Sequence, residues 1–138
     1  MDIKALNRIV IEQFRAGGEI EGLHRERLLL LTTVGRRTHR AITTPMMFHP
    51  DGDRLLVMAS DAGSPRVPDW YRNLLAEPHV VVEVGDERYP ALAVPAEGAE
   101  RERLWAIVTQ NYPFFIDHQA KAGRTIPVVV LTRVADLG

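Results

Sequence analysis

The first stretch of the chain has the hydrophobic spacing of an amphipathic helix. Within residues 3–16, apolar side chains recur three and four positions apart, and the pattern ends at Gly17-Gly18. These side chains are Ile3, Leu6, Ile9, Val10 and Phe14. We expect a helix within residues 1–18 that lies on the protein core. Because its polar face is not strongly basic, we expect at most peripheral membrane contact through this helix.

After Arg27 the pattern changes to short apolar and β-branched runs, which are typical of strands. The run at 28–34 is almost continuously apolar and is followed by Gly35, which predicts a strand buried on both faces. Asp51-Gly52-Asp53 and Gly85-Asp86-Glu87 each separate two such runs, so they predict antiparallel hairpins. The further expected strands are 41–49, 54–59, 80–84, 88–94 and 125–133.

Two more segments have a helical pattern, residues 69–76 before Pro78 and residues 99–111. A chain of 138 residues has the usual size of one domain, and it contains no repeat, low-complexity segment or linker. We therefore predict one α+β domain over residues 1–138. Its six or so mainly antiparallel strands curl into a barrel, with the helices at the periphery.

Composition narrows the chemistry that the side chains can perform. The chain has no cysteine, which excludes thiol nucleophiles, zinc-thiolate sites, iron–sulfur clusters and disulfides, and which suits a reducing compartment. A net charge of −1 gives no general footprint for nucleic acid. The N-terminal residues do not resemble a signal peptide, and no apolar run is long enough to span a membrane. We expect a cytoplasmic protein.

Familiar catalytic motifs are absent from the sequence. It has no GxSxG, HExxH, GxxxxGK[ST] or GxGxxG motif in the required context. The five histidines share no spacing typical of metal ligands, so we assign no metal site. Redox chemistry would therefore need a bound cofactor.

The turn after the first buried strand carries the most distinctive chemistry. Residues 34–40 read Val-Gly-Arg-Arg-Thr-His-Arg. A turn that begins with glycine exposes backbone N–H groups, and guanidinium groups pair with phosphate or carboxylate. The segment is a candidate anion site, although a solvated basic hairpin tip would have the same composition.

Two further segments favour a ligand site. Along residues 58–65 an expected strand runs into small residues, which let a flat ligand approach the backbone. Residues 68–74 open a short helix after a proline, with aromatic and polar side chains near a helix N-terminus that favours negative charge. Trp70 taken alone is more typical of a core residue.

In combination, these segments resemble the deazaflavin-dependent nitroreductase family. The resemblance covers residues 28–133. It rests on residues 29–38, 44–48, 59–60, 68–74 with Pro78 after them, 112–113 and 124–130. It implies a split β-barrel, FMN-binding-like fold and the cofactor coenzyme F420, a deazaflavin with a phospholactyl and oligoglutamate tail.

The resemblance also implies roles for individual residues. Arg36, Arg37 and Thr38 would hold the phosphate and the tail of the cofactor. The residues that would line the deazaflavin ring are Thr43, Thr44, Pro45, Met46, Met47, Met58, Ala59, Ser60 and Asp61. The rest of the cofactor wall would be Asp69, Trp70, Tyr71, Arg72 and Asn73. The substrate would meet Met47, Ser60, Tyr112, Phe115 and His118, of which Ser60, Tyr112 and His118 are the candidate catalytic residues.

The chain departs from the family pattern at several of these positions. His39 stands where a glycine is usual, Ile42 where relatives often have an arginine, and Asp61 where the residue is frequently basic. The tail site therefore has less positive charge, for which Arg40 lies close enough to compensate. Met47 and His118 stand where some nitroreductases have tyrosines.

The resulting hypothesis is an F420H2-dependent oxidoreductase. It would pass a hydride from the deazaflavin to an electron-poor conjugated acceptor, such as a quinone, an activated enone or lactone, or a nitro compound. A homodimer is in keeping with the resemblance. Three alternatives stay open: an FMN-dependent split-barrel oxidase, a haem-binding protein, and a carrier of F420 or a fatty acid that turns nothing over.

Overall fold

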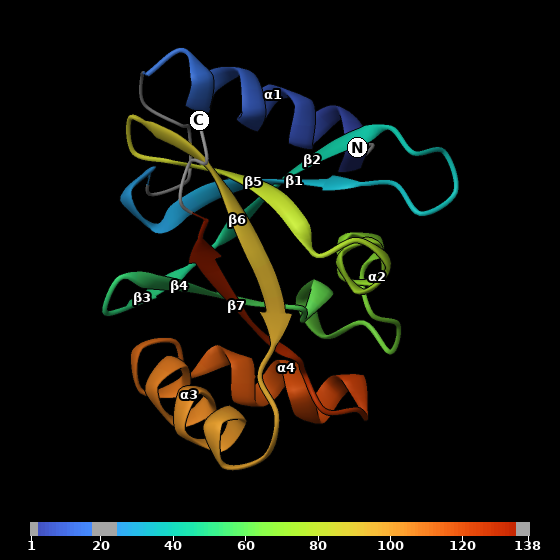
Figure 1. The fold of residues 1–138 in the computed structure, drawn as a ribbon. Helices are drawn as coiled ribbons and strands as arrows, with labels where there is room; N and C mark the ends of the chain where they lie inside the picture. The colour runs from blue at the N-terminus through green and yellow to red at the C-terminus, as the bar shows by residue number, and fades with distance from the viewer. Residues whose placement is uncertain (1–2, 18–24, 135–138) are drawn as a thin grey trace.

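One antiparallel sheet of seven strands organises the computed structural model, which describes residues 3–17 and 25–134 (Figure 1). Along the sheet the strand order is β2-β1-β5-β6-β7-β4-β3. The strands are β1 (Leu28–Val34), β2 (Ala41–Met47), β3 (His49–Asp51), β4 (Arg54–Met58), β5 (His79–Val84), β6 (Glu87–Pro95) and β7 (Val128–Arg133). The helices are α1 (Ile3–Arg15), α2 (Asp69–Ala76), α3 (Gly98–Asn111) and α4 (Phe114–Ala122), with short 3-10 turns η1 (Arg25–Arg27) and η2 (Asp61–Gly63).

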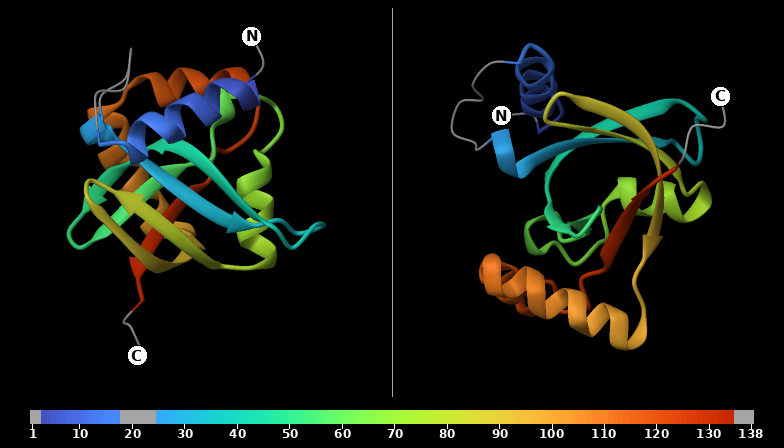
Figure 2. Two further views of the ribbon diagram at one scale, coloured as in Figure 1. Left: turned by 90° about the horizontal axis from the view of Figure 1, so that it is seen from above. Right: turned by 60° about the vertical axis from the view of Figure 1, so that its left-hand side comes forward.

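The sheet curls because its two edge strands follow one another in the sequence. β2 and β3 end the strand order on opposite sides, yet only Phe48 lies between them in the chain. The sheet must therefore bend back on itself, and β2 contacts β4. The curl is plain in the second view of Figure 2. The predicted α+β fold with a split β-barrel is confirmed, with one strand more than expected because residues 41–49 form two strands rather than one.

The first strand shows why its sequence is apolar without interruption. Leu29 and Leu31 belong to the main core cluster inside the curled sheet. Leu28 and Leu30 point to the other face, where they pack against Phe14 of α1. Both faces of β1 are thus buried, as the sequence predicted.

Helices pack on the sheet at three places, one of which is taken by α2 against β1 and β6. α1 lies over β1 and β2, while α3 and α4 lie at the opposite end of the molecule (Figure 1). Helix α4 was not among the expected elements. It follows Pro113 and ends at Gly123 in the left-handed region (φ 67°), which are usual punctuation for a helix start and end. No helix in the described part of the chain is both long and apolar enough to cross a membrane.

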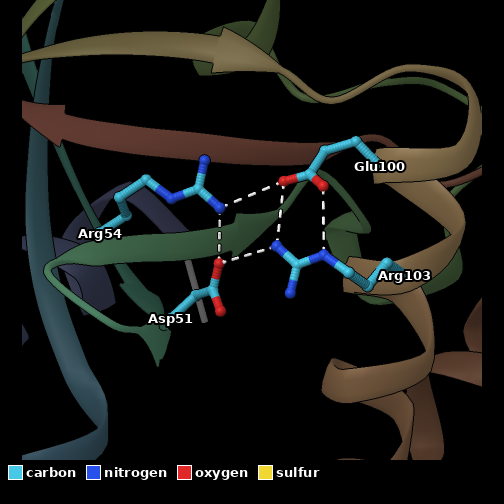
Figure 3. A network of polar contacts seen from close by, with 4 residues as sticks. All are labelled: Asp51, Arg54, Glu100 and Arg103. Carbon is cyan, nitrogen blue, oxygen red and sulfur yellow. Dashed lines mark hydrogen bonds and ion pairs between the residues drawn. The ribbon is translucent and has the colours of Figure 1, made fainter.

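A network of ion pairs fastens α3 to the β3–β4 hairpin (Figure 3). Arg54 contacts Asp51 at 2.6 Å and Glu100 at 3.1 Å. Arg103 contacts the same two carboxylates at 3.2 Å and 3.1 Å. The hydrogen bond from Arg54 lowers the pKa of Asp51, and the hydrogen bond from Arg103 lowers the pKa of Glu100.

Candidate functional site

The basic turn between β1 and β2 is tightly closed. The N–H of Gly35 donates to the carbonyl of Arg40, and the N–H of His39 donates to the carbonyl of Gly35, both at 2.8 Å. A Cβ on Gly35 would lie 2.7 Å from Oγ1 of Thr38, so a larger residue would require the Thr38 side chain to move. His39 has a φ of 58°, in the left-handed region that glycine adopts most easily. This backbone conformation is one that the glycine implied at this position by the family resemblance would adopt with less strain than His39.

Arg36 joins this turn to helix α2. Its backbone N–H and its guanidinium both donate to Oδ1 of Asn73, at 3.2 Å and 2.9 Å, and the guanidinium also contacts Asp69 at 3.3 Å. Asn73 is buried and donates to Oγ1 of Thr33 at 3.4 Å. Arg37 and Thr38 are exposed beside this pair. Arg36 is therefore held in place by its contacts with α2, whereas the neighbouring Arg37 is exposed to solvent.

Two connected clefts run from this turn along β2 and α2. The first, of about 200 Å³, is lined by Gly35, Arg36, Arg37, Thr38, Ile42, Asp69 and Asn73. The second, of about 540 Å³, is lined by Asn7, Arg8, Ile11, Arg15, Ile42, Thr43, Thr44, Asp61, Pro68, Asp69, Trp70 and Asn73. Ile42, Asp69 and Asn73 line both, so the two clefts adjoin one another. Residues predicted for the cofactor thus gather along one groove.

The four residues from α1 in this groove were missed from the sequence. Helical periodicity indicates that a helix has an apolar face, but not which ligand cleft its other face borders. That placement depends on packing of Val10 and Phe14 against β1, which is a tertiary contact. No local signal in residues 3–16 would have identified it.

The loop after β4 carries the candidate ring-binding residues Ser60 and Asp61. Asp61 and Ala62 both have positive φ angles, 48° and 53°, which non-glycine residues adopt at some cost. Arg124 holds this loop, since its guanidinium donates to four backbone carbonyls at 3.1–3.2 Å. The acceptors are the carbonyls of Ala59, Ser60, Ser64 and Arg66.

Ser60 and His118 come together although they lie far apart in the sequence. Oγ of Ser60 and Nδ1 of His118 are 3.0 Å apart, and Ser60 is only 3% exposed. The tautomer of the imidazole decides which of the two groups donates. The contact requires η2 to pack closely on α4. Gly63 allows this packing because it has no side chain, whereas a Cβ at this position would lie 3.2 Å from the carbonyl oxygen of His118. Two of the three candidate catalytic residues therefore form one polar pair.

The third, Tyr112, lies in an aromatic cluster beside this pair. Its ring is 6.3 Å from that of Phe115, which in turn is 5.8 Å from the imidazole of His118. Tyr112 and Phe115 also line a small, mostly apolar pocket with Met47, Phe48, His49, Leu56, Met58 and Val108. Four of the five residues predicted to meet the substrate, all but Ser60, thus lie in or directly beside this pocket.

Other predicted cofactor residues lie away from the groove. Met46 packs against the main core, and Ala59 is part of it. Tyr71 lines a different cleft, with Arg101 and Pro127. Pro45 and Arg72 line neither of the two connected clefts. Trp70 is both a core residue and part of the groove wall.

Comparison with known proteins identifies the family of the chain. The sequence profile of the F420H(2)-dependent quinone reductases matches residues 6–133. An F420H(2)-dependent quinone reductase of Mycobacterium tuberculosis is 43% identical over 108 residues, which cover 76% of this chain and 72% of that protein.

Two solved structures resemble the fold closely. An F420-H2-dependent reductase (FDR-A) superposes with a TM-score of 0.71 at 34% identity, over 80% of this chain and 99% of the other. A protein described as a domain-swapped dimer gives a TM-score of 0.73 at 31% identity, over 94% of this chain and 99% of the other. The chain therefore belongs to the F420H(2)-dependent quinone reductase family, whose members are oxidoreductases that use coenzyme F420.

Proposed function

We propose that this protein binds F420H2 in the two connected clefts and reduces a quinone or a related conjugated acceptor beside Ser60 and His118. The observation that carries the proposal is the continuity of the groove. It begins at the basic turn, passes between β2 and α2, and reaches Asp61, the neighbour of Ser60.

The residues along the groove suit the parts of this cofactor in order. Arg36, Arg37 and Thr38 offer guanidinium, hydroxyl and backbone donors of the kind that bind phosphate and carboxylate groups. Farther along, Thr43, Thr44 and Trp70 form walls with small polar and flat aromatic surfaces, as a tricyclic ring requires. The bound cofactor would supply a hydride to the acceptor.

The protein's own contribution is binding, orientation and charge stabilisation. Ser60 is fixed by the Arg124 contacts to its loop and by His118, so its hydroxyl has a defined position. When Nδ1 of His118 carries a proton and donates to Oγ of Ser60, the Ser60 hydroxyl can donate to an acceptor oxygen that gains negative charge, and Tyr112 is the second candidate donor. The proton that completes the reduction would come from Ser60, Tyr112, His118 or water.

The side chains around the small pocket beside the pair, whose free volume of about 10 Å³ is less than a quinone needs, would form the surface against which the substrate lies. Met47, Met58 and Phe115 line it with apolar, polarizable surface, and Tyr112 and His49 add few polar groups. We therefore propose flat, uncharged, conjugated acceptors as the substrate class. The quinone substrate in the names of the relatives is one such class.

The test is a titration of the purified protein with F420, FMN and haem, followed by steady-state assays. We expect saturable binding of F420 and F420H2-dependent reduction of a menadione-type quinone. Preferential binding of FMN or haem would support the corresponding alternative. Binding of F420 without turnover of any acceptor would support a carrier.

Assembly and location belong to the same proposal. A homodimer is supported by the related structure described as a domain-swapped dimer, and light scattering in solution tests it. We further propose a cytoplasmic location, with membrane contact limited to the exposed side chains of α1, such as Leu6 and Ile9. Fractionation of cells that express the full chain tests both points.

A further inference from the structure

One side of helix α1 forms a wall of the larger cleft. Arg8, Ile11 and Arg15 are spaced three and four residues apart, which places them on one stripe of the helix, and all three line the cleft. The neighbouring stripe carries Val10 and Phe14, which pack into the core cluster with β1. The buried contacts of α1 thus fix which of its polar side chains face the groove.

The two arginines of this stripe differ in their partners. Arg15 makes a bidentate ion pair with Glu83, at 3.0 Å and 2.9 Å, and Glu83 is 9% exposed. This hydrogen bond raises the pKa of Arg15 and commits its charge to a buried carboxylate. Arg8 is exposed and makes no ion pair with another described residue. Arg8 is therefore the cation of this cleft wall that is available to a ligand.

The other charges that line the larger cleft are negative. Asp61 and Asp69 both line it, and the side chain of Asp69 is 82% exposed despite its contact with Arg36. Ile42, which lines the same cleft from β2, contributes no charge. With Arg15 paired to Glu83, an anionic group of the cofactor that lies where the two clefts adjoin, near Ile42, would meet two carboxylates and a single unpaired cation of the larger cleft, Arg8.

We propose that Arg8 binds an anionic group of the cofactor's side chain, either its phosphate or a tail carboxylate, and that α1 is thereby part of the cofactor site. This inference rests on the proposed function, since it requires F420 to occupy the connected clefts. Arg8 lies on the helix that packs against β2, whose Ile42 lines the same cleft without a charge. A guanidinium there has the geometry to pair with either anion.

The experiment compares Arg8→Gln with wild type and with Arg88→Gln. Arg88 is an exposed arginine on β6 that lines neither connected cleft, so its variant has the same change in net charge away from the site. Fluorescence titration gives the Kd for three ligands: F420 with its full tail, F420 lacking the glutamates, and the deazaflavin without phosphate or tail. Thermal melting shows that each variant is folded.

We expect Arg8→Gln to weaken binding of full-length F420 by roughly three- to tenfold, the range for a partly exposed charge-assisted contact. Binding of the bare deazaflavin should not change. If the loss persists with the ligand that lacks glutamates, the partner is the phospholactyl group; if it disappears, the partner is a glutamate carboxylate of the tail. Arg8→Lys should recover part of the affinity, because it restores the charge without the planar fork.

Equal affinity of Arg8→Gln and wild type for full-length F420 at low salt would overturn the inference. An equal loss in Arg88→Gln would overturn it as well, because the effect would then reflect net charge. A loss that extends to the bare deazaflavin would point to displacement of α1 instead of a lost ion pair. Failure of the wild-type protein to bind any of the three ligands would refute the proposed function itself. The wild-type titration therefore separates this outcome from a failure of the Arg8 inference.

Discussion

Oγ of Ser60 and Nδ1 of His118 are 3.0 Å apart, which links the loop after β4 to helix α4. If the two groups act as a unit, their substitutions are not additive. We expect Ser60→Ala and His118→Ala each to lower kcat/KM by no more than about 10²- to 10³-fold, and the double variant to cost little more than the worse single one. Steady-state kinetics with F420H2 and a menadione-type quinone measure this.

Tyr112→Phe serves as the comparison for this pair. It removes a hydroxyl from the neighbouring aromatic cluster and leaves the Ser60–His118 contact in place. If the reduction of kcat/KM in the double variant equals the product of the two single reductions, Ser60 and His118 act independently. Complete loss of turnover in one variant, with cofactor still bound, would identify an obligatory acid.

Arg36 and Arg37 are adjacent but should respond differently to substitution. Either change to Ala should weaken F420 binding by roughly 10- to 150-fold, since each removes a charge-assisted contact. Only Arg36→Ala also removes the guanidinium hydrogen bond to Asn73 and the ion pair with Asp69, so only this variant should lower the melting temperature clearly. Fluorescence titration and thermal melting measure the two effects. Unchanged affinity in both variants would contradict the assignment of the anion site.

Much of the fold followed from local sequence pattern. The continuous apolar run of β1, the two hairpin turns and the helix at 69–76 are each encoded by neighbouring residues, and the structure has all of them. Helix α4 escaped prediction because residues 114–122 form no clear apolar stripe, and its boundaries depend on Pro113 and Gly123.

The candidate site was less accessible from the sequence, because its contacts are long-range. Arg36 and Asn73 were both expected near the cofactor, but the bond between them spans 37 positions and depends on how α2 lies against β1. The contribution of α1 and the support of the Ser60 loop by Arg124 likewise follow from packing between elements distant in the chain.

Arg124 should be important for the shape of the ring-binding loop. Its guanidinium satisfies carbonyls at four positions of the loop, a geometry that a single ammonium cannot reproduce. We expect Arg124→Lys to destabilise the fold by about 1–3 kcal/mol, the usual cost of leaving buried acceptors unsatisfied. Urea denaturation measures the loss, and F420 affinity should fall with it. A variant with wild-type stability and affinity would show that the loop holds its conformation without these bonds.

The network around Asp51 and Glu100 should make stability depend on acid pH. Bonds from Arg54 and Arg103 hold the pKa of each carboxylate below its ordinary value. A carboxylate whose pKa is lower in the folded state contributes stability above its unfolded pKa and loses it as the pH falls through the folded value. We therefore expect the melting temperature to decline below about pH 4, where Asp and Glu ordinarily titrate.

Asp51→Asn isolates this contribution. It should lower the melting temperature at pH 7 and make the decline toward pH 3 shallower. Asp53→Asn is the matched control, because Asp53 lies exposed in the same turn and makes no ion pair with another described residue. The same pH profile in Asp51→Asn and wild type would show that other carboxylates dominate acid unfolding.

Substrate choice should follow the apolar pocket. The family resemblance implies that Met47 and His118 stand where some nitroreductases have tyrosines, so we expect clear reduction of quinones and activated enones and weak or no reduction of nitro compounds. Steady-state assays with a menadione-type quinone, an unsaturated lactone and a bicyclic nitroimidazole compare the three. Faster turnover of the nitroimidazole than of both others would mean that these positions do not control selectivity.

The meeting of the two sheet edges at Phe48 has a consequence for how the protein acquires its activity. The groove and the adjacent pocket take residues from β2 at one edge and from β4 near the other, and these surfaces meet only when the sheet has closed. No fragment that lacks either end of the strand order should bind the ligand. The protein should therefore become able to bind its ligand only late in folding, when the barrel closes. A saturating ligand should in turn slow the reopening of the barrel.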